Sequence, residues 1–377
     1  MTLIDAAWLL RFANGEVMPA CKGVVPAWQQ LPLEAKVDVT KLQQVTLYEK
    51  LPIGVLSYGW ASRAHPDPTG EQLQRLVPML RAILEQDCGL DGAIFGIIWD
   101  FMSLPQRGYT TGYDPTHDDR TAYELERFKE GLKGINVWYG HPSVTTLVCD
   151  WPMPGGAENA APIERRGWCI FEKALSSVSK RSSCLLTLSR MPASYWDQSR
   201  PPKHTLRYLT QAAGGREPPL PPDMFETLLR DGMAREATEK GSGIRFTNGK
   251  DATDICIPQY REGFLRLMGR AEALSYDGIG IGDAGVAQLL SALRYAHSAG
   301  VPSLATQLNL RSNQAITDAA LPGLAATLEE GVMPKLEVLL IDEIGFEPTE
   351  GMAKLVTDLK RSRPSLRVDV CDEPAVW

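Results

Sequence analysis

Two short apolar segments constrain the fold of this chain more than any other feature. Residues 53–56 and residues 93–99 each end where polar or aromatic side chains begin. The second segment lacks alternation of polar and apolar residues, which is typical of a strand covered by helices on both faces. Amphipathic helical patterns and further apolar runs follow along the chain, at residues 73–84, 119–132, 144–149 and 184–188. Strands and helices that alternate at this spacing predict an α/β fold with a mostly parallel sheet.

The side chains that follow the first two strands are candidates for a binding site. Ser57, Tyr58 and Trp60 come at the end of the first strand, whereas Asp100 and Ser103 follow the second. Open parallel sheets bind ligands at the carboxyl ends of their strands, so we expect these five residues to converge there with Glu172 around one ligand, with the loop at 65–70 as a candidate lid. Two structural alternatives stay open. The aspartate could fix an Asx turn, and the aromatic side chains could simply pack in the core.

Glu172 is a candidate of another kind, on the helix that contains Trp168. It lies four residues after that tryptophan and beside an apolar stripe that includes Phe171 and Leu175. Residues three and four apart share one side of a helix. A carboxylate at the border of such a stripe can therefore reach a cleft and keep its contact with solvent. The alternative, a glutamate on the helix surface or one that caps a neighbouring loop, stays open.

Composition narrows the classes of partner. The formal net charge of −7 argues against nucleic-acid binding, and the densest basic runs, such as Lys180-Arg181, are expected to be solvated surface. No run approaches ~18 consecutive apolar residues, so we expect no membrane span. His65 and His117 stand near aspartates without a third ligand, and we expect no metal site. Cysteines without a Cys-x-x-Cys pair, and an early acid where a secretory peptide carries positive charge, predict a cytoplasmic location.

The last third of the chain contains a repeat. Residues 281–286 align with residues 316–321, and a third copy begins at Gly351-Met352. A Pro-x-Leu triplet follows each copy, with a period of roughly 31–35 residues. The segment at 308–313 supplies a strand followed by an asparagine. The pattern resembles the leucine-rich repeat, in the variant with a full helix per repeat, and implies an α/β repeat segment that docks on the preceding domain.

The middle of the chain resembles the Toll/interleukin-1-receptor (TIR) family. The residues that carry the resemblance are Ser57-Tyr58, Asp100, Leu104-Pro105 and Trp168-Cys169-Ile170-Phe171-Glu172. Over residues 50–265 the chain looks more specifically like a group from unicellular algae and other protists, with blocks such as Trp138-Tyr139-x-His141. The resemblance implies a flavodoxin/TIR-like sheet flanked by helices. It also implies NAD as a candidate substrate, with Glu172 as the glutamate that NAD-cleaving members use.

We therefore expect four parts along the chain. They are an N-terminal extension at 1–45, a TIR-like α/β domain at 46–195, a Pro-rich bridging segment at 196–265 with a short helix at 224–229, and a leucine-rich-repeat-like domain at 266–377. Two function classes compete. One is a cytoplasmic signalling scaffold that binds a protein partner through its repeats, with self-association as a further candidate interaction. The other is a NAD glycohydrolase or related nucleotide-processing enzyme, in which Glu172 stabilises an oxocarbenium-like state.

Overall fold

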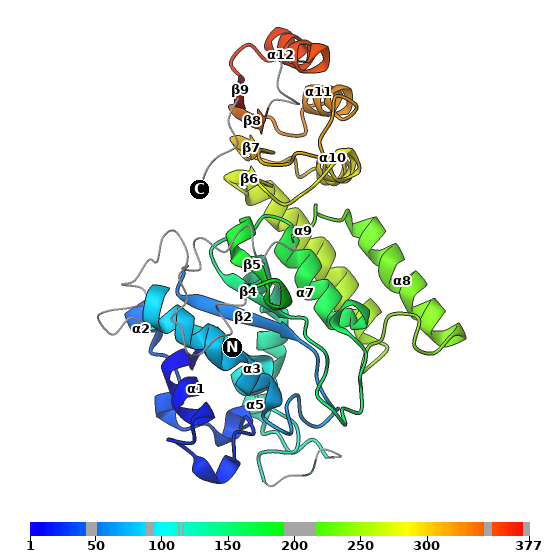
Figure 1. The fold of residues 1–377 in the computed structure, drawn as a ribbon. Coiled ribbons are helices and arrows are strands. Elements are labelled where there is room, and N and C mark those ends of the chain that lie inside the picture. The colour runs from blue at the N-terminus through cyan, green and yellow to red at the C-terminus, as the bar shows by residue number, and fades with distance from the viewer. Residues whose placement is uncertain are drawn as a thin grey trace. The chain divides into compact units, whose positions relative to one another are not determined.

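The computed structural model in Figure 1 describes residues 1–42, 51–87, 94–111, 114, 117–191, 216–342 and 349–371. The chain forms two compact units. The first comprises residues 1–139, 143–169 and 186–213, and the second comprises residues 140–142, 170–185 and 214–377. The predicted boundaries near residues 45 and 195 lie outside the described residues. The predicted boundary at residue 265 falls inside a continuous helix, α9 (Ile257–Arg270).

The first unit is built on a five-stranded sheet with the order β1-β3-β2-β4-β5. Its strands are β1 (Ile4–Asp5), β2 (Ile53–Tyr58), β3 (Gly96–Ile98), β4 (Thr145–Cys149) and β5 (Leu185–Thr187). Strand β2 pairs in parallel with β3 on one side and with β4 on the other, as the apolar runs predicted. Strand β1 pairs antiparallel with β3, so the sheet is mixed.

Helices cover this sheet and bury one continuous core. They are α1 (Ala6–Ala13), α2 (Val39–Leu42), α3 (Glu71–Ala82), α4 (Asp100–Ser103), α5 (Ala122–Lys133), α6 (Ile135–Gly140) and α7 (Gly167–Ser177), the last of which continues into the second unit. Trp8 and Phe12 of α1 pack with Leu73 and Leu76 of α3 in the same cluster as the strand residues. The predicted helix at 73–84 is thus confirmed, although its last residues form a π-helical turn at Ile83–Asp87.

The second unit contains two long helices followed by strands and helices in strict alternation. The helices are α8 (Pro222–Thr238) and α9, and the alternating elements are β6 (Ala273–Ser275), α10 (Asp283–Ser298), β7 (Gln307–Asn309), α11 (Leu321–Glu329), β8 (Val338–Asp342), α12 (Glu350–Ser362) and β9 (Arg367–Cys371). The expected short helix at 224–229 is wrong in length, because α8 runs for 17 residues.

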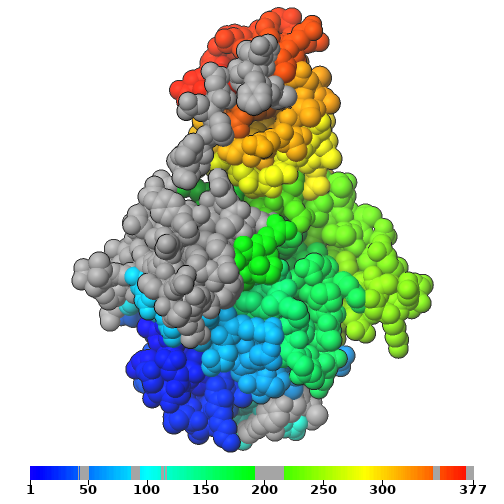
Figure 2. All heavy atoms as spheres, in the orientation of Figure 1, coloured from blue at the N-terminus to red at the C-terminus, as the bar shows by residue number. Residues whose placement is uncertain are grey.

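Strands β6 to β9 form a four-stranded parallel sheet in chain order. Figure 1 shows the helices α10, α11 and α12 in successive layers beside it, from yellow to red, and Figure 2 shows the same order of colours in the atoms of this segment. Asn313 fixes the turn between two layers. Its Nδ2 donates to the carbonyl oxygens of Tyr276 and Leu310, and its Oδ1 accepts from the backbone N–H groups of Gly280 and Ile281. One buried amide therefore satisfies polar groups of two neighbouring repeats.

No helix in the described part of the chain is both long and apolar enough to cross a membrane. Across the same residues, no group of three or more histidine, cysteine, aspartate or glutamate side chains is arranged to hold a metal ion.

Candidate functional site

Three of the predicted site residues meet at the carboxyl ends of β2 and β3. The Tyr58 hydroxyl donates to Asp100 Oδ1, and the Trp60 indole Nε1–H donates to Asp100 Oδ2 at 3.0 Å. The backbone N–H of Phe101 also donates to Oδ1, at 2.6 Å. The two strands are parallel neighbours, which brings Tyr58 at the end of one close to Asp100 directly after the other. The carboxylate is therefore held by three donors, all of them uncharged.

Aromatic rings surround this carboxylate. The Phe101 ring centroid lies 5.7 Å from Trp60, 5.6 Å from Tyr109 and 4.5 Å from His65, and the first two contacts are edge-to-face. Burial among these rings raises the pKa of Asp100, against the opposing effect of its hydrogen-bond donors. Burial also raises the pKa of Tyr58, and the negative charge of Asp100 adds to this shift. The Asp100 carboxyl group is thus desolvated, and no cation is among the interactions that shift its pKa.

Ser57 and Ser103 do not bind Asp100. Ser103 Oγ accepts the backbone N–H of Trp99 at 3.0 Å and so closes the short α4 turn. Ser57 is fully buried, and its Oγ has no hydrogen-bond partner among the residues that the structure describes. Successive side chains of a strand point to opposite faces, so Ser57 is directed away from the face that Tyr58 uses. The five predicted binding residues therefore divide into one hydrogen-bonded trio and two serines in other surroundings.

Glu172 lies on the part of α7 that belongs to the second unit, whereas the trio belongs to the first. After burial and Asp251, the negative charge of Glu172 is a third cause that raises the pKa of Cys256. Its carboxylate therefore lies near the π-helical turn at Ala252–Cys256. Convergence of Glu172 with Asp100 around one ligand stays a prediction.

The space between the carboxyl ends of β2 and β4 is occupied by the chain itself. The buried Arg166 guanidinium donates to the carbonyl oxygens of Trp60 and Ala161, each at 2.8 Å, and to that of Asn159 at 2.5 Å. A Cβ atom added to Gly59 would lie 2.7 Å from Arg166 Nε, so a larger residue at this position would have to displace the guanidinium group. Ligands of open α/β sheets bind outside the carboxyl ends of the strands, at the point where the strand order reverses. In this sheet that point is at β2, between β3 and β4. The Arg166 side chain lies there, beside the end of β2.

The loop at 65–70, expected to be a lid, is tied to the end of β2. The buried Asp67 carboxylate accepts the backbone N–H groups of Gln72 and Leu73 and caps α3. Gln72 Nε2 donates to the carbonyl oxygens of Gly59 and Pro66 at 3.0 and 2.8 Å. These bonds make the loop a helix-capping segment. Its role as a lid stays a prediction.

Comparison with protein-family models, curated proteins and solved structures gave no match.

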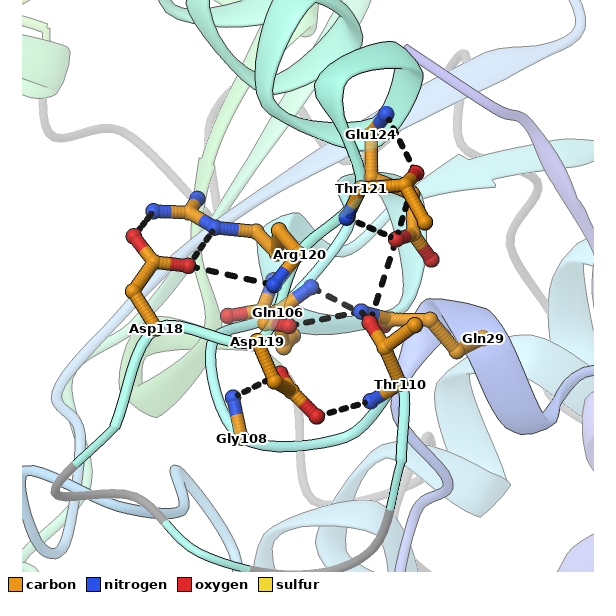
Figure 3. Close-up of polar contacts among 9 residues, drawn as sticks. All are labelled: Gln29, Gln106, Gly108, Thr110, Asp118, Asp119, Arg120, Thr121 and Glu124. Atoms are coloured by element: carbon orange, nitrogen blue, oxygen red, sulfur yellow. Dashed lines mark hydrogen bonds and ion pairs between the residues drawn. The ribbon is translucent and has the colours of Figure 1, made fainter.

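A second polar cluster, around Asp119, is structural (Figure 3). Asp119 accepts the backbone N–H groups of Gly108, Thr110 and Thr111, at 2.8, 2.8 and 2.7 Å, and these bonds lower its pKa to about 2. Thr121 and Glu124 beside it form a capping box at the start of α5. The Thr-x-x-Glu spacing signals this box in the sequence. No comparable sequence motif predicts that the three backbone N–H groups converge on the Asp119 carboxylate.

The sequence interpretation missed two buried cations in the second unit. Lys180, expected to be solvated, is fully buried, and its Nζ donates to the carbonyl oxygen of His141 at 2.6 Å. Burial lowers its pKa to about 7. Arg216 is 2% exposed, and its guanidinium lies 4.3 Å from the Tyr276 ring centroid. Short basic runs carry no local sign of burial, because the covering elements come from distant parts of the chain.

We expect Asp100→Ala to destabilise the first unit by about 2–4 kcal/mol, because it leaves the Tyr58 hydroxyl and the Trp60 indole N–H without their acceptor. Tyr58→Phe keeps the ring and removes one donor, so its expected cost is smaller, about 1 kcal/mol. Urea unfolding of the purified proteins measures both. Glu158→Ala, at an exposed loop position, is the matched control and should stay within about 0.5 kcal/mol of wild type. An Asp100→Ala protein as stable as this control would refute the structural role.

Proposed function

We propose that this chain is a cytoplasmic signalling scaffold, a TIR-like domain followed by leucine-rich-repeat-like layers, that binds a protein partner through the sheet face of its second unit. The observation that supports the proposal is the parallel sheet β6–β9, because its alternate side chains are left partly or fully exposed. Helices α10 to α12 follow these strands in turn, and the inward side chains are buried, as at Leu274, Leu308 and Leu339. Among the described residues, the side chains of the opposite face keep partial or full exposure that a partner can cover.

The exposed side chains form two rows across the strands. The strand register aligns Ala273, Gln307, Val338 and Arg367 in one row, and Ser275, Asn309, Leu340 and Asp369 in the other. We name this surface the sheet face. Val338 and Leu340 place two apolar side chains on the inner strand β8, between the amide side chains of β7 and the charged side chains of β9. A small apolar centre with a polar rim is the composition of protein–protein interfaces.

The first unit supports a scaffold more than an open ligand crevice. Tyr58, Trp60 and Asp100 satisfy one another, and Arg166 fills the edge between β2 and β4. A platform of this kind fits the self-association that the TIR resemblance implies.

NAD cleavage is the alternative proposal. Glu172 keeps partial exposure on α7, and a carboxylate close to a ribosyl group stabilises the positive charge that develops as the glycosidic bond breaks. Asp100 and its aromatic neighbours would then bind part of the nucleotide.

Substitution on the sheet face separates these proposals. Leu340→Arg should abolish capture of a protein partner by chemical cross-linking in native extract, because it places a charge at the apolar centre of the interface. Leu304→Arg, 44% exposed on the loop before β7, is the matched control and should retain the partner. The same cross-linked partners in wild type and Leu340→Arg would contradict the scaffold. Nicotinamide release from NAD by concentrated wild type, lost in Glu172→Ala, would establish the enzyme instead.

A further inference from the structure

A pocket of about 310 Å³ lies in the first unit, between α5 and the loop that follows α4. Ser103, Leu104 and Pro105 form one wall, and Tyr123 and Arg127 of α5 form part of the other. Small-molecule sites are typically concave, about 300–1,000 Å³ in volume, and mostly apolar with a few placed polar groups. This pocket is at the small end of that range. It is separate from Asp100 and from the sheet face.

Glycine at one position of α5 creates the shape of the pocket. A Cβ atom added to Gly131 would lie 2.1 Å from Leu104 Cδ2, so the leucine packs directly on the helix backbone. Tyr123 and Arg127 precede this glycine by eight and four residues and share its side of α5. The larger side chains of Tyr123 and Arg127 therefore flank a depression at Gly131, and Leu104 and Pro105 form its apolar floor.

Arg127 supplies a cation inside the pocket. Its Nη1 donates to the Tyr123 hydroxyl at 3.1 Å, and its guanidinium carbon lies 5.6 Å from the ring centroids of both Tyr123 and Trp28. Within the described ranges, no carboxylate forms an ion pair with it. The two rings orient the guanidinium, and most of its N–H donors remain for another acceptor. A planar guanidinium held in this way suits a carboxylate.

Glu126 supplies the opposite charge one residue earlier on the helix. It lines the pocket, is exposed, and forms no ion pair with the basic side chains that the structure describes. Glu130, also in the lining, is instead paired with Lys133 at 2.9 Å. Met1 also lines the pocket, and after burial the charge of Arg127 is a second cause that lowers the pKa of its α-amino group. Among the side chains of the lining, Arg127 and Glu126 therefore offer one cation and one carboxylate that form no ion pair within the described residues, beside an apolar floor.

We propose that this pocket binds a free α-amino acid with an apolar side chain. The ligand carboxylate pairs with Arg127, its ammonium group pairs with Glu126, and its side chain lies on Leu104 and Pro105. Neither charged group of the pocket alone selects this ligand, because a simple acid or a simple amine satisfies only one of them. Specificity comes from recognition of both the carboxylate and the ammonium group of the ligand.

Calorimetric titration with L-leucine, 4-methylpentanoate and 3-methylbutylamine tests the proposal on the full chain. Leucine should bind at least about tenfold more tightly than either single-headed analogue, since each lost charge-assisted contact weakens binding by about that factor. Arg127→Gln should weaken leucine and 4-methylpentanoate but leave 3-methylbutylamine unchanged. Glu126→Gln should show the reverse selectivity. Lys129→Ala, at an exposed position of α5 outside the pocket lining, should bind leucine like wild type.

Two results would overturn the proposal. The first is absence of heat from leucine, methionine and phenylalanine with wild type whose melting curve shows a folded protein. The second is an unchanged leucine affinity in Arg127→Gln. Glu126→Gln removes a charge without changing the shape of an exposed side chain, so this variant should keep its fold. Melting curves of both variants show whether each is folded, which separates lost binding from loss of fold.

Discussion

Replacement of Lys180 with methionine is expected to remove a rise in stability that the wild-type protein shows between pH 7 and pH 10. The amine is fully buried, and burial lowers its pKa from 10.5 to about 7. The charge of Arg216 acts in the same direction, whereas Cys184 opposes it. In the unfolded chain the same amine titrates near its ordinary value. Folding therefore disfavours the charged form.

The sign of the effect follows from proton binding. Between the folded and unfolded pKa values, the unfolded chain holds a proton that the folded protein has released, so the free energy of unfolding rises with pH. The penalty is fully present below pH 7 and is relieved as the pH approaches 10. One pKa unit corresponds to about 1.4 kcal/mol, so the rise is on the order of 3–4 kcal/mol over this window. Methionine has a similar length and no charge, and removes this contribution.

Urea unfolding at pH 7, 8, 9 and 10 measures this effect as the difference between wild type and Lys180→Met. Titrating groups that do not interact with Lys180 cancel in that difference, and His141, whose pKa burial and the charge of Lys180 lower from 6.5, titrates below this pH range. Lys354→Met, at an exposed position of α12, is the control and should follow the wild-type curve. Parallel curves for wild type and Lys180→Met would show that the buried amine keeps its proton in the fold.

Replacement of Arg216 with alanine is expected to destabilise the second unit by about 3 kcal/mol or more. Its guanidinium donates to the carbonyl oxygens of Ser177, Val178 and Ser275, where α7 ends and β6 ends. Each buried acceptor left without its donor costs about 1–3 kcal/mol. The cation also neutralises the negative end of the α7 dipole, which Ser177 and Val178 carry.

Thermal unfolding measures this loss, with an expected fall in melting temperature of about 6–12 °C for a unit of this size. Arg216→Lys should recover only part of the stability, because an ammonium group lacks the planar fork that reaches three carbonyl groups and stacks on Tyr276. Arg235→Ala, on the exposed side of α8, should melt like wild type. Equal melting temperatures for Arg216→Ala and Arg235→Ala would show that the three carbonyl contacts contribute little.

Several elements could be predicted because their signal is local. Residues 53–56 are a short apolar run and residues 144–149 are rich in β-branched residues, and both segments lie in adjacent parallel strands. The repeat copies predicted strand–helix alternation after residue 266, and the register that aligns Leu274, Leu308 and Leu339 follows from it. The antiparallel strand β1 was missed because it has only two residues, too few for any periodic pattern.

The candidate site was predicted only in part. Placement of Tyr58, Trp60 and Asp100 at neighbouring strand ends follows from the rule that parallel strands end at one edge. Their mutual hydrogen bonds, across 40 and 42 positions of the chain, do not follow from it. A polar residue at a strand end looks the same in the sequence whether it faces a ligand or another side chain.

Short segments of the sequence encode the alternation of strands and helices, the repeat copies and the edge at which Tyr58 and Asp100 meet, because periodicity and strand order are local signals. Burial of Lys180 and Arg216, and the position of Arg166 beside β2, follow instead from the packing of the folded chain. Burial of a charge depends on which distant elements cover it and on which carbonyl groups they bring within reach. Those contacts form only when the whole chain is packed.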